Sequence, residues 1–159
     1  MKEIPLTRGK IALVDDEDYE AVARYHWCFS CGYAKRQATL APKKTAMVYM
    51  HRLLVGAVKG QEVDHINMNK LDNRRANLRL CTPSQNKANQ NRRIDNRSGF
   101  KGVCLRKRKM KWEAQIAVGG HNMHLGYFAD RIDAARAYDA AAMRHFGEFA
   151  RLNFPEVVD

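Results

Sequence analysis

The sequence predicts an α+β protein made of two parts joined by a short polar segment. In the second part, three stretches between residues 103 and 125 alternate apolar and polar side chains, and an alanine-rich helical stretch follows them. The first part mixes short strand-like and helix-like stretches, and residues 89–98 between the parts are almost wholly polar. Alternation with a period of two is typical of half-buried strands, so we expect the second part to be a three-stranded sheet plus one helix.

The composition indicates a globular protein with a polyanionic partner. The chain has 159 residues, of which 45% are hydrophobic, enough for a core and too many for a disordered chain. A formal net charge of +11 favours nucleic acid as the partner, ahead of an anionic membrane. No apolar run approaches the ~18 residues of a membrane span, and residues 1–10 lack the apolar core of a signal peptide. We therefore expect a cytoplasmic protein with reduced thiols and no membrane partner.

The first part is expected to begin with two short strands and a helix. Residues 2–14 indicate two strands broken at residues 7–9, and residues 15–27 indicate a helix with one apolar face. The acidic residues 15–18 lie at the start of this helix, where the helix dipole favours negative charge, and we favour this account over a metal site. A turn at residues 30–32 separates two short extended pieces, and the apolar element that follows ends near Gly56.

The cysteines do not form a typical zinc-binding set. Cys28 and Cys31 are spaced as C-x-x-C, whereas Cys81 and Cys104 stand alone, and structural zinc usually requires a second close pair. His26 is near enough in sequence to act as a further ligand. We favour hairpin packing for the pair, with a zinc site as the alternative.

Residues 63–86 concentrate short polar side chains in an expected order of strand, polar loop and helix. Residues 63–66 indicate a strand, and residues 67–70 indicate the turn after it. Residues 82–85 read Thr-Pro-Ser-Gln, in which a capping threonine, a proline at the first helical position and a glutamine in the first turn predict a helix start. Asn86 then falls in the first turns of that helix.

The residue types in this segment fit hydrolytic chemistry as well as a structural role. Asp64 offers a hard anionic oxygen and Asn86 a neutral one, so together they could hold a divalent ion with water and phosphate as further ligands. A neutral imidazole at His65 could take a proton from water, and Asn77 could fix its tautomer. Because adjacent strand residues face opposite ways, Asp64 and His65 can share a site only at a strand end or a bulge. An asparagine-rich surface loop with a buried histidine is the equal alternative.

One face of the expected C-terminal sheet is strongly polar and basic. Gly119-Gly120 predicts the hairpin turn between its last two strands, and residues 130–147 predict the helix, with Asp130 and Gly147 as its caps. We favour a nucleic-acid surface over a merely solvated face, because a two- or three-stranded sheet fits the DNA major groove. The face away from the helix carries Cys104, Arg106, Arg108, Lys111, Gln115, Asn122 and His124.

The stretch VDHINMNKLDNRRANLRLCTPSQN resembles the HNH endonuclease motif, in the form found in phage and intron homing nucleases. The resemblance runs from about Tyr49 to Asn89. It implies that His65 is the general base, Asn77 orients that base, and Asp64 and Asn86 bind the metal. An asparagine at the last position, where many such enzymes have histidine, favours Mg²⁺ or Mn²⁺ over zinc. His51 also recurs in relatives, and we interpret it as structural.

Residues 98–155 resemble the plant ethylene-response-factor DNA-binding domain, which binds the major groove with its three-stranded sheet. The resemblance rests on SGFKGV, LGYF, AARAYD and LNFP in this sequence. Several expected contact positions depart from the family, so the docking mode is expected to persist and the plant target sequence is not. The expected DNA contacts are Lys101, Arg106, Arg108, Lys111, Gln115, Asn122 and His124.

Together these features predict a metal-dependent DNA endonuclease of the homing type that nicks double-stranded DNA as a monomer or weak dimer. The expected domains are an HNH nuclease over residues 1–91, a linker over 92–97 and a DNA-binding domain over 98–159. The alternative is a non-catalytic, sequence-specific DNA-binding regulator that keeps the HNH fold only as a platform. An RNA-binding protein would fit the charge but not the sheet motif.

Overall fold

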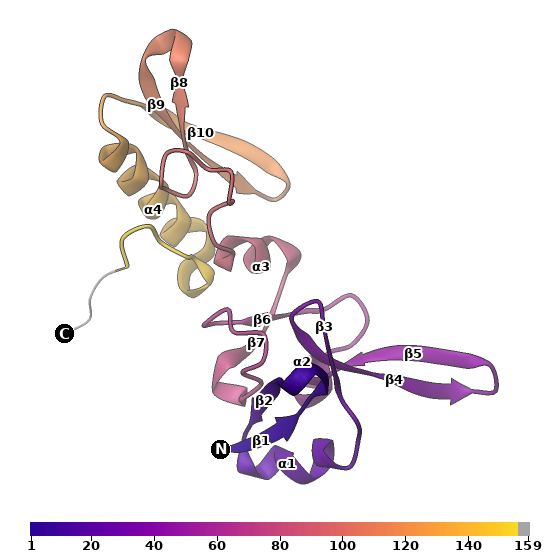
Figure 1. Ribbon diagram of the computed structural model, residues 1–159. Coiled ribbons are helices and arrows are strands. Elements are labelled where there is room, and N and C mark those ends of the chain that lie inside the picture. Colours follow the sequence, from indigo (N-terminus) through magenta and orange to yellow (C-terminus); the bar gives the residue numbers. More distant parts are fainter. Residues whose placement is uncertain (156–159) are drawn as a thin grey trace. The chain divides into compact units, whose positions relative to one another are not determined.

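A computed structural model describes residues 1–155 of the chain, and Figure 1 shows its helices and strands. Small antiparallel sheets and helices are mixed along the sequence, so the predicted α+β class is confirmed. The chain forms two compact units, Met1–Thr82 and Pro83–Asp159, and each has its own core. Within residues 1–155, no helix combines the length and the apolar character that crossing a membrane requires.

The first unit begins as predicted, except that its helix is shorter. Strands β1 (Lys2–Pro5) and β2 (Ile11–Val14) pair antiparallel around the 3₁₀ turn Thr7–Gly9, and α1 (Asp16–Ala23) follows. The expected end of α1 at residue 27 is wrong. Trp27 leaves the helix because its ring is buried in the core and its indole nitrogen donates to the Val22 carbonyl at 2.8 Å.

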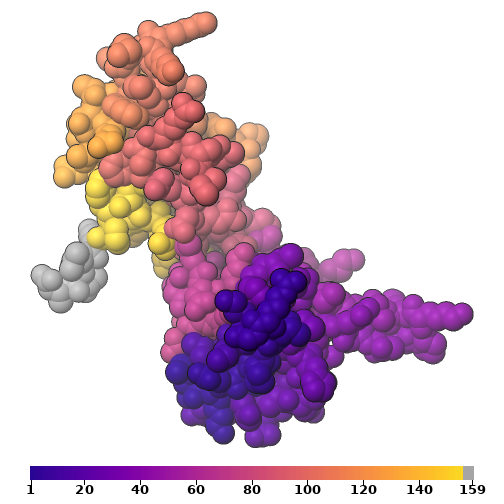
Figure 2. Space-filling model, viewed as in Figure 1, coloured from indigo at the N-terminus to yellow at the C-terminus, as the bar shows by residue number. Residues whose placement is uncertain are grey.

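A three-stranded antiparallel sheet and a two-stranded one complete the first unit. The larger contains β3 (Cys28–Ser30), β4 (Tyr33–Ala41) and β5 (Lys44–Tyr49) in that order, and α2 (Met50–Leu54) follows it. The smaller pairs β6 (Glu62–His65) with β7 (Leu78–Cys81), and the 3₁₀ turn Arg75–Asn77 directly precedes β7. The β4–β5 hairpin stands out from the body of this unit, as Figure 2 shows.

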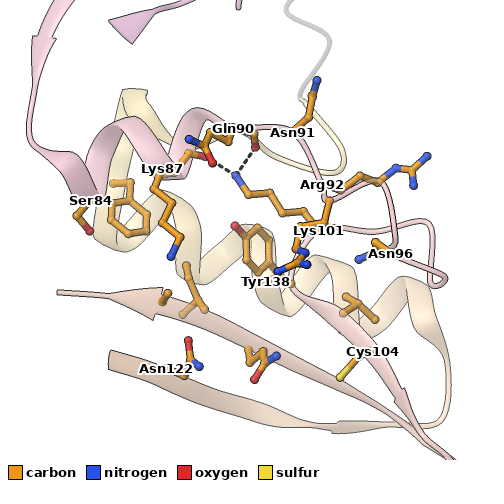
Figure 3. Close-up of a pocket in the computed structure, with 18 of the residues that line it drawn as sticks. Ser84, Lys87, Gln90, Asn91, Arg92, Asn96, Lys101, Cys104, Asn122 and Tyr138 are labelled. Carbon is orange, nitrogen blue, oxygen red and sulfur yellow. Dashed lines mark hydrogen bonds between the residues drawn. The ribbon is translucent and has the colours of Figure 1, made fainter. Parts of the chain in front are cut away.

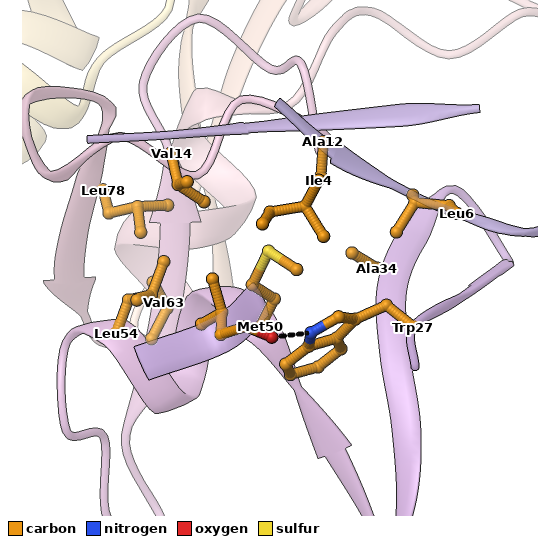
Figure 4. Packing of buried hydrophobic residues seen from close by; sticks show 11 residues of the cluster. Ile4, Leu6, Ala12, Val14, Trp27, Ala34, Met50, Leu54, Val63 and Leu78 are labelled. Atoms are coloured by element: carbon orange, nitrogen blue, oxygen red, sulfur yellow. Dashed lines mark hydrogen bonds between the residues drawn. The ribbon is translucent and has the colours of Figure 1, made fainter. Parts of the chain in front are cut away.

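The hydrophobic core of the first unit lies beneath β1, β2 and α2. Figure 4 shows Met50 between Trp27 and the aliphatic side chains of the first two strands. Ala12, Val14, Val22 and Met50 have no exposed surface. Cys28 begins β3 and Cys31 lies in the β3–β4 turn, where it adopts a left-handed conformation with φ of 53°, and both are exposed. This position agrees with the hairpin interpretation of the C-x-x-C pair.

The second unit begins with α3 (Pro83–Asn89), which the capping pattern predicted. Its sheet contains β8 (Val103–Arg106), β9 (Lys111–Val118) and β10 (His121–Phe128), with β9 in the middle. The 3₁₀ turn Lys107–Lys109 joins β8 to β9. Helix α4 (Arg131–Phe146) and the 3₁₀ turn Gly147–Phe149 follow the sheet, and the Asp130 side chain caps α4 as predicted.

Small side chains let α4 pack closely on one face of the C-terminal sheet. Ala134 and Ala135 are wholly buried against Val103 and Ala114, and Tyr138 is buried beside Ile116. The opposite face of the sheet is therefore the one available to a partner, and the predicted polar side chains lie there except Arg108, which lies in the turn Lys107–Lys109.

The boundary between the units lies before α3, upstream of the linker expected at residues 92–97. The Lys101 ammonium donates to the Ala88 carbonyl and to the Gln90 carbonyl, the latter at 2.7 Å, and Arg151 donates its backbone N–H to Ala88 at 3.2 Å. These bonds hold the C-terminal end of α3 to the second unit. Burial lowers the pKa of Lys101 to about 8.

Replacing Gly102 by alanine is expected to destabilise the second unit by roughly 3 kcal/mol or more. Gly102 has φ of 75°, and an added Cβ would lie 1.9 Å from the Tyr138 ring and 2.7 Å from the Gln115 carbonyl oxygen. Gly99 is the matched control, because its φ is 85° and no atom lies within 4 Å of an added Cβ. Gly99→Ala should cost only about 1–2 kcal/mol. Denaturant unfolding of both variants measures the difference, and equal losses would contradict the close approach.

Candidate functional site

Asp64 and His65 are the last two residues of β6. Each is only 5% exposed, and they pair in register with Arg79 and Leu78 of β7. The alternation of strand side chains directs the two toward different surroundings, but His65 ends its strand. The condition set by the sequence, that these neighbours can share a site only at a strand end, is therefore met.

The His65 imidazole is enclosed by an amide and aromatic rings. Its Nε2 lies 3.4 Å from Oδ1 of Asn73, which is wholly buried. The ring centroids of His51 and Tyr33 lie 5.0 and 6.1 Å away. Burial lowers the pKa of His65 below its ordinary value, although Asn73 and Asp64 oppose the shift. A neutral imidazole can accept a proton, so the surroundings suit a general base.

The amide beside the base is Asn73, where the sequence predicted Asn77. The Asn77 side chain instead accepts from the Asn67 backbone N–H at 2.9 Å and donates to the Asp72 carbonyl at 2.8 Å. The reason is that Asn77 directly precedes β7. From there its side-chain amide reaches back to the loop that follows β6. Asn77 therefore closes the loop that follows His65.

The loop between β6 and β7 is organised around the buried Asp72 carboxylate. Arg74 donates to it through Nε and Nη2, both at 2.7 Å, and Asn67 donates through Nδ2 at 2.8 Å. The Arg74 hydrogen bonds lower the pKa of Asp72 below its ordinary value, so this carboxylate stays ionised. The backbone of Asn73 also bonds to Leu13 of β2, which ties the loop to the first sheet.

Arg79 neutralises the Asp64 carboxylate within β6 and β7. Its Nε and Nη2 lie 3.0 and 2.8 Å from Oδ2 of Asp64. The two side chains are only 12% and 6% exposed, so the pair is largely removed from water. Buried charges require such compensation, and a divalent cation would supply it by the same oxygen chemistry. The donor chemistry of Asp64 therefore fits Mg²⁺ or Mn²⁺, although any ion there shares the carboxylate with Arg79.

His51 forms part of the wall around His65. Burial, followed by the nearby His65, lowers the pKa of His51 to about 3, so the ring is neutral. Its Nδ1 is buried without a hydrogen-bond partner among residues 1–155, and its ring packs against Tyr33 and Tyr49 at 5.1 and 5.6 Å. These contacts agree with the structural role expected for His51. Asn86 lies on α3 in the second unit, so its pairing with Asp64 stays a prediction of the sequence motif.

The predicted nucleic-acid surface has an acidic centre that the sequence did not indicate. Glu113 lies in the middle of β9, between Cys104 on β8 and Tyr127 on β10. Its side chain is only 8% exposed and accepts from Arg106 and from His124, the latter at 3.0 Å. Burial alone would raise the pKa of Glu113, but the hydrogen bonds from Arg106, Cys104 and His124 lower it. Glu113 thus orients two of the predicted DNA contacts.

The remaining predicted contacts fall into different settings. Arg108 lies in the turn Lys107–Lys109, beyond the strand, and Lys111 begins β9 opposite Arg106. Gln115 and Asn122 border a pocket at the other end of β9. The Lys101 ammonium is bound to α3 carbonyls, so the structure gives it a structural role instead of the predicted exposure to DNA.

Three residues around these sites could not be found by residue type alone. Asn73 is one of many asparagines in its segment, and Arg79 is identified only by the register of β6 with β7. Glu113 follows the period-two pattern, which placed it on the polar face, but nothing in the pattern showed its burial.

Comparison with known proteins finds a similarity to HNH endonucleases in the middle of the chain. Residues 48–88 match the HNH endonuclease family model. An uncharacterised HNH endonuclease of Acanthamoeba polyphaga mimivirus is 27% identical over 152 residues, which cover 92% of this chain and 76% of that protein. Protein 3.8 of Escherichia phage T7 is 36% identical over 66 residues, which cover 40% of this chain and 54% of the phage protein.

The C-terminal region is similar to plant DNA-binding domains. Dehydration-responsive element-binding protein 2C of Arabidopsis thaliana is 42% identical over 65 residues, which cover 36% of this chain and only 19% of that protein. The predicted resemblance to an HNH endonuclease joined to an AP2/ERF-type domain is confirmed. These similarities support a nuclease that binds DNA.

Replacing Arg79 by alanine is expected to destabilise the first unit by about 3–5 kcal/mol, because it leaves the buried Asp64 carboxylate without its arginine. Arg93→Ala is the control, since Arg93 and Asp95 form an ion pair whose side chains are 85% and 64% exposed. That change should alter stability by no more than about 0.5 kcal/mol. Denaturant unfolding of the full chain measures both, and similar small effects would show that Asp64 does not depend on Arg79.

Proposed function

We propose that the protein is a metal-dependent HNH endonuclease that nicks double-stranded DNA and is positioned on it by the C-terminal sheet. The observation that carries this proposal is the buried His65 imidazole at the end of β6, beside Asp64 and inside the segment that matches the HNH family model. Resemblance to phage and intron nucleases further supports a homing-type enzyme that acts in the cytoplasm of its host.

In the proposed reaction, His65 accepts a proton from the water that attacks a DNA phosphodiester. The surroundings that lower its pKa keep the ring ready to take this proton near neutral pH. Asn73 and the ring of His51 restrict the orientation of the His65 ring. The ring nitrogen that accepts the proton is therefore already in position before the substrate binds.

The divalent ion in this proposal is held by oxygen ligands from Asp64 and Asn86. When bound, Mg²⁺ or Mn²⁺ would polarise the phosphate and stabilise the leaving 3′ oxygen. Within the first unit, Arg79 holds the Asp64 carboxylate in place, and Asn77 keeps closed the loop that follows β6. Asn86 enters the proposal through the sequence motif.

The C-terminal sheet is proposed to enter the DNA major groove with the face that α4 leaves open. Arg106, Arg108 and Lys111 would contact phosphates, while Gln115, Asn122 and His124 would contact base edges. By function, we assign residues 1–91 to the chemistry, 92–97 to the linker and 98–159 to positioning, so this functional division falls after α3 although α3 packs with the second unit. One HNH site per chain cuts one strand, so a monomer is expected to nick, and a double-strand break would need a second subunit.

A non-catalytic DNA-binding regulator is the second candidate, and one observation favours it. Arg79 already neutralises Asp64. A protein that keeps the HNH fold only as a platform would retain this ion pair for stability. Incubation of supercoiled plasmid with the full-length protein and Mg²⁺ separates the two functions. Conversion to the open circular form supports the nuclease, and binding without conversion supports the regulator.

Replacing His65 by alanine is expected to reduce the nicking rate by about 10²–10⁴-fold, because the general base is lost. DNA affinity should stay nearly unchanged. His145→Ala is the control, since His145 is an exposed histidine on α4. Rates of plasmid nicking at saturating protein measure the effect, and His65→Gln, which keeps more of the side-chain volume, separates lost chemistry from lost folding. Near-wild-type rates for both His65 variants would refute the assignment.

The same assay tests the proposed ligands. Asp64→Asn and Asn86→Ala should both abolish nicking, and EDTA-treated wild-type protein should regain activity with Mg²⁺ or Mn²⁺. Recovery with zinc alone would show that the oxygen-ligand assignment is wrong.

The salt dependence of DNA binding is expected to distinguish Arg106 from Arg108 and Lys111. Arg108→Ala and Lys111→Ala should each reduce the slope of log affinity against log salt by about 0.9, the value for one lost phosphate contact. Arg106→Ala should reduce it less, because Glu113 already neutralises that guanidinium. Affinities for duplex DNA over a salt series measure the slopes. Equal changes in all three variants would show that Glu113 does not weaken the phosphate contact of Arg106.

A further inference from the structure

The second unit contains a pocket of about 480 Å³ that neither the nuclease chemistry nor the fold explains. The pocket lies between α3, the polar segment after it and the end of β9. There the Gln115 backbone N–H donates to the Gly102 carbonyl, the last hydrogen bond that β9 makes to the segment leading into β8. Figure 3 shows side chains from these segments around the pocket. Its volume is in the range of small-molecule sites.

The hydroxyl group of Tyr138 faces this pocket and has no protein partner within residues 1–155. Tyr138 is only 5% exposed, its ring packs against Gly102, and it lines the pocket. Within residues 1–155, its hydroxyl forms no hydrogen bond and is not among the fully enclosed polar atoms. Burial raises the pKa of Tyr138 to about 12, so the hydroxyl keeps its proton and can donate. Because this hydroxyl has no protein partner and is accessible from the pocket, it is free to donate to a ligand there.

Positive charge exceeds negative charge around the pocket. Lys87 and Arg92 form no ion pair within residues 1–155, and Arg93 is paired with Asp95. Lys101 lies in the wall with its ammonium on two carbonyls and no carboxylate bonded to it. Figure 3 shows the Lys87 ammonium directed from α3 toward the strands, on the side of Asn122. Such a surplus of cations suits an anionic ligand.

Amide and apolar groups line the rest of the pocket. The side chains of Gln115 and Asn122 form no hydrogen bond within residues 1–155, and each offers both donors and an acceptor. Ile116 and Phe146 contribute apolar surface. The ligand that matches this lining has an anionic end and a flat part with hydrogen-bonding edges.

We propose that this pocket binds a nucleoside monophosphate unit, with the phosphate near Lys87 and Arg92 and the base near Gln115, Asn122 and Tyr138. The unit can come from a free mononucleotide or from a nucleotide displaced from bound DNA, since both present the same chemistry. Binding requires no cleavage and no metal ion, so its failure would leave the proposed nuclease function standing.

Calorimetric titration of the full-length protein with each of the four deoxynucleoside monophosphates, in EDTA, tests the site. Saturable binding is expected for at least one nucleotide. Tyr138→Phe and Lys87→Ala should each weaken it by roughly 3–10-fold, the scale of one lost hydrogen bond or exposed charge contact. Tyr138→Phe should unfold like the wild type, because the hydroxyl has no protein partner. Arg144→Ala is the control, since Arg144 is an exposed cation on α4 outside the pocket, and it should bind like the wild type.

Two further binding measurements identify the ligand and its source. Inorganic phosphate should bind more weakly than the nucleotide, and equal binding would overturn the role of the base contacts. If the ligand is a nucleotide displaced from DNA, a duplex with a single unpaired nucleotide should bind more tightly than the intact duplex, and Tyr138→Phe should bind the two duplexes equally. If free nucleotides bind but the two duplexes bind the wild type equally, the ligand is a free mononucleotide. The proposal is overturned if no nucleotide binds saturably, or if Tyr138→Phe and Lys87→Ala both bind like the wild type.

Discussion

The buried carboxylate of Asp72 holds together the loop on which the candidate active site depends. It accepts two hydrogen bonds from Arg74 while being only 1% exposed. The neighbouring Asn73 bonds to Leu13 of β2 through its backbone and reaches His65 through its side chain. An unpaired carboxylate in this place would be costly, so the loop is stable only while its donors are bound. The position of the imidazole therefore follows from a satisfied polar network, which apolar packing alone would not determine.

The same solution recurs at four of the five buried acids that the structure describes; the fifth, Asp139, accepts from Asn153 and from the backbone of Phe154 instead. Four buried carboxylates each accept from an arginine, in the pairs Asp64–Arg79, Asp72–Arg74, Asp18–Arg75 and Glu113–Arg106. The planar guanidinium suits this task because its fork of donors matches a carboxylate. In a chain of net charge +11, these buried acids serve the fold locally, and the surplus of cations is left for a polyanion. The basic character of the protein is therefore a property of its surface.

Local pattern was sufficient for the strands and caps, and insufficient for contacts that depend on register or on a distant partner. Period-two alternation predicted the three C-terminal strands and the side chains on their open face. Trp27 broke its predicted helix because the ring is stabilised in a core that the local pattern does not show. The partner of His65 is Asn73, a choice among asparagines that only the closed loop decides. Likewise, Arg79 meets Asp64 through strand pairing, and Lys101 meets α3 through tertiary packing.

The acidic centre of the C-terminal sheet affects how the protein would search DNA. The Glu113 carboxylate cancels the charge of Arg106 and so weakens the attraction of this face to every phosphate backbone alike, whereas the oriented His124 favours only matching base edges. In the proposed complex, the carboxylate therefore shortens the residence time on random DNA more than on the target. A protein of this charge would otherwise spend most of its time bound to the wrong sequences. One buried glutamate thus favours rapid scanning along the duplex, at the expense of some total affinity.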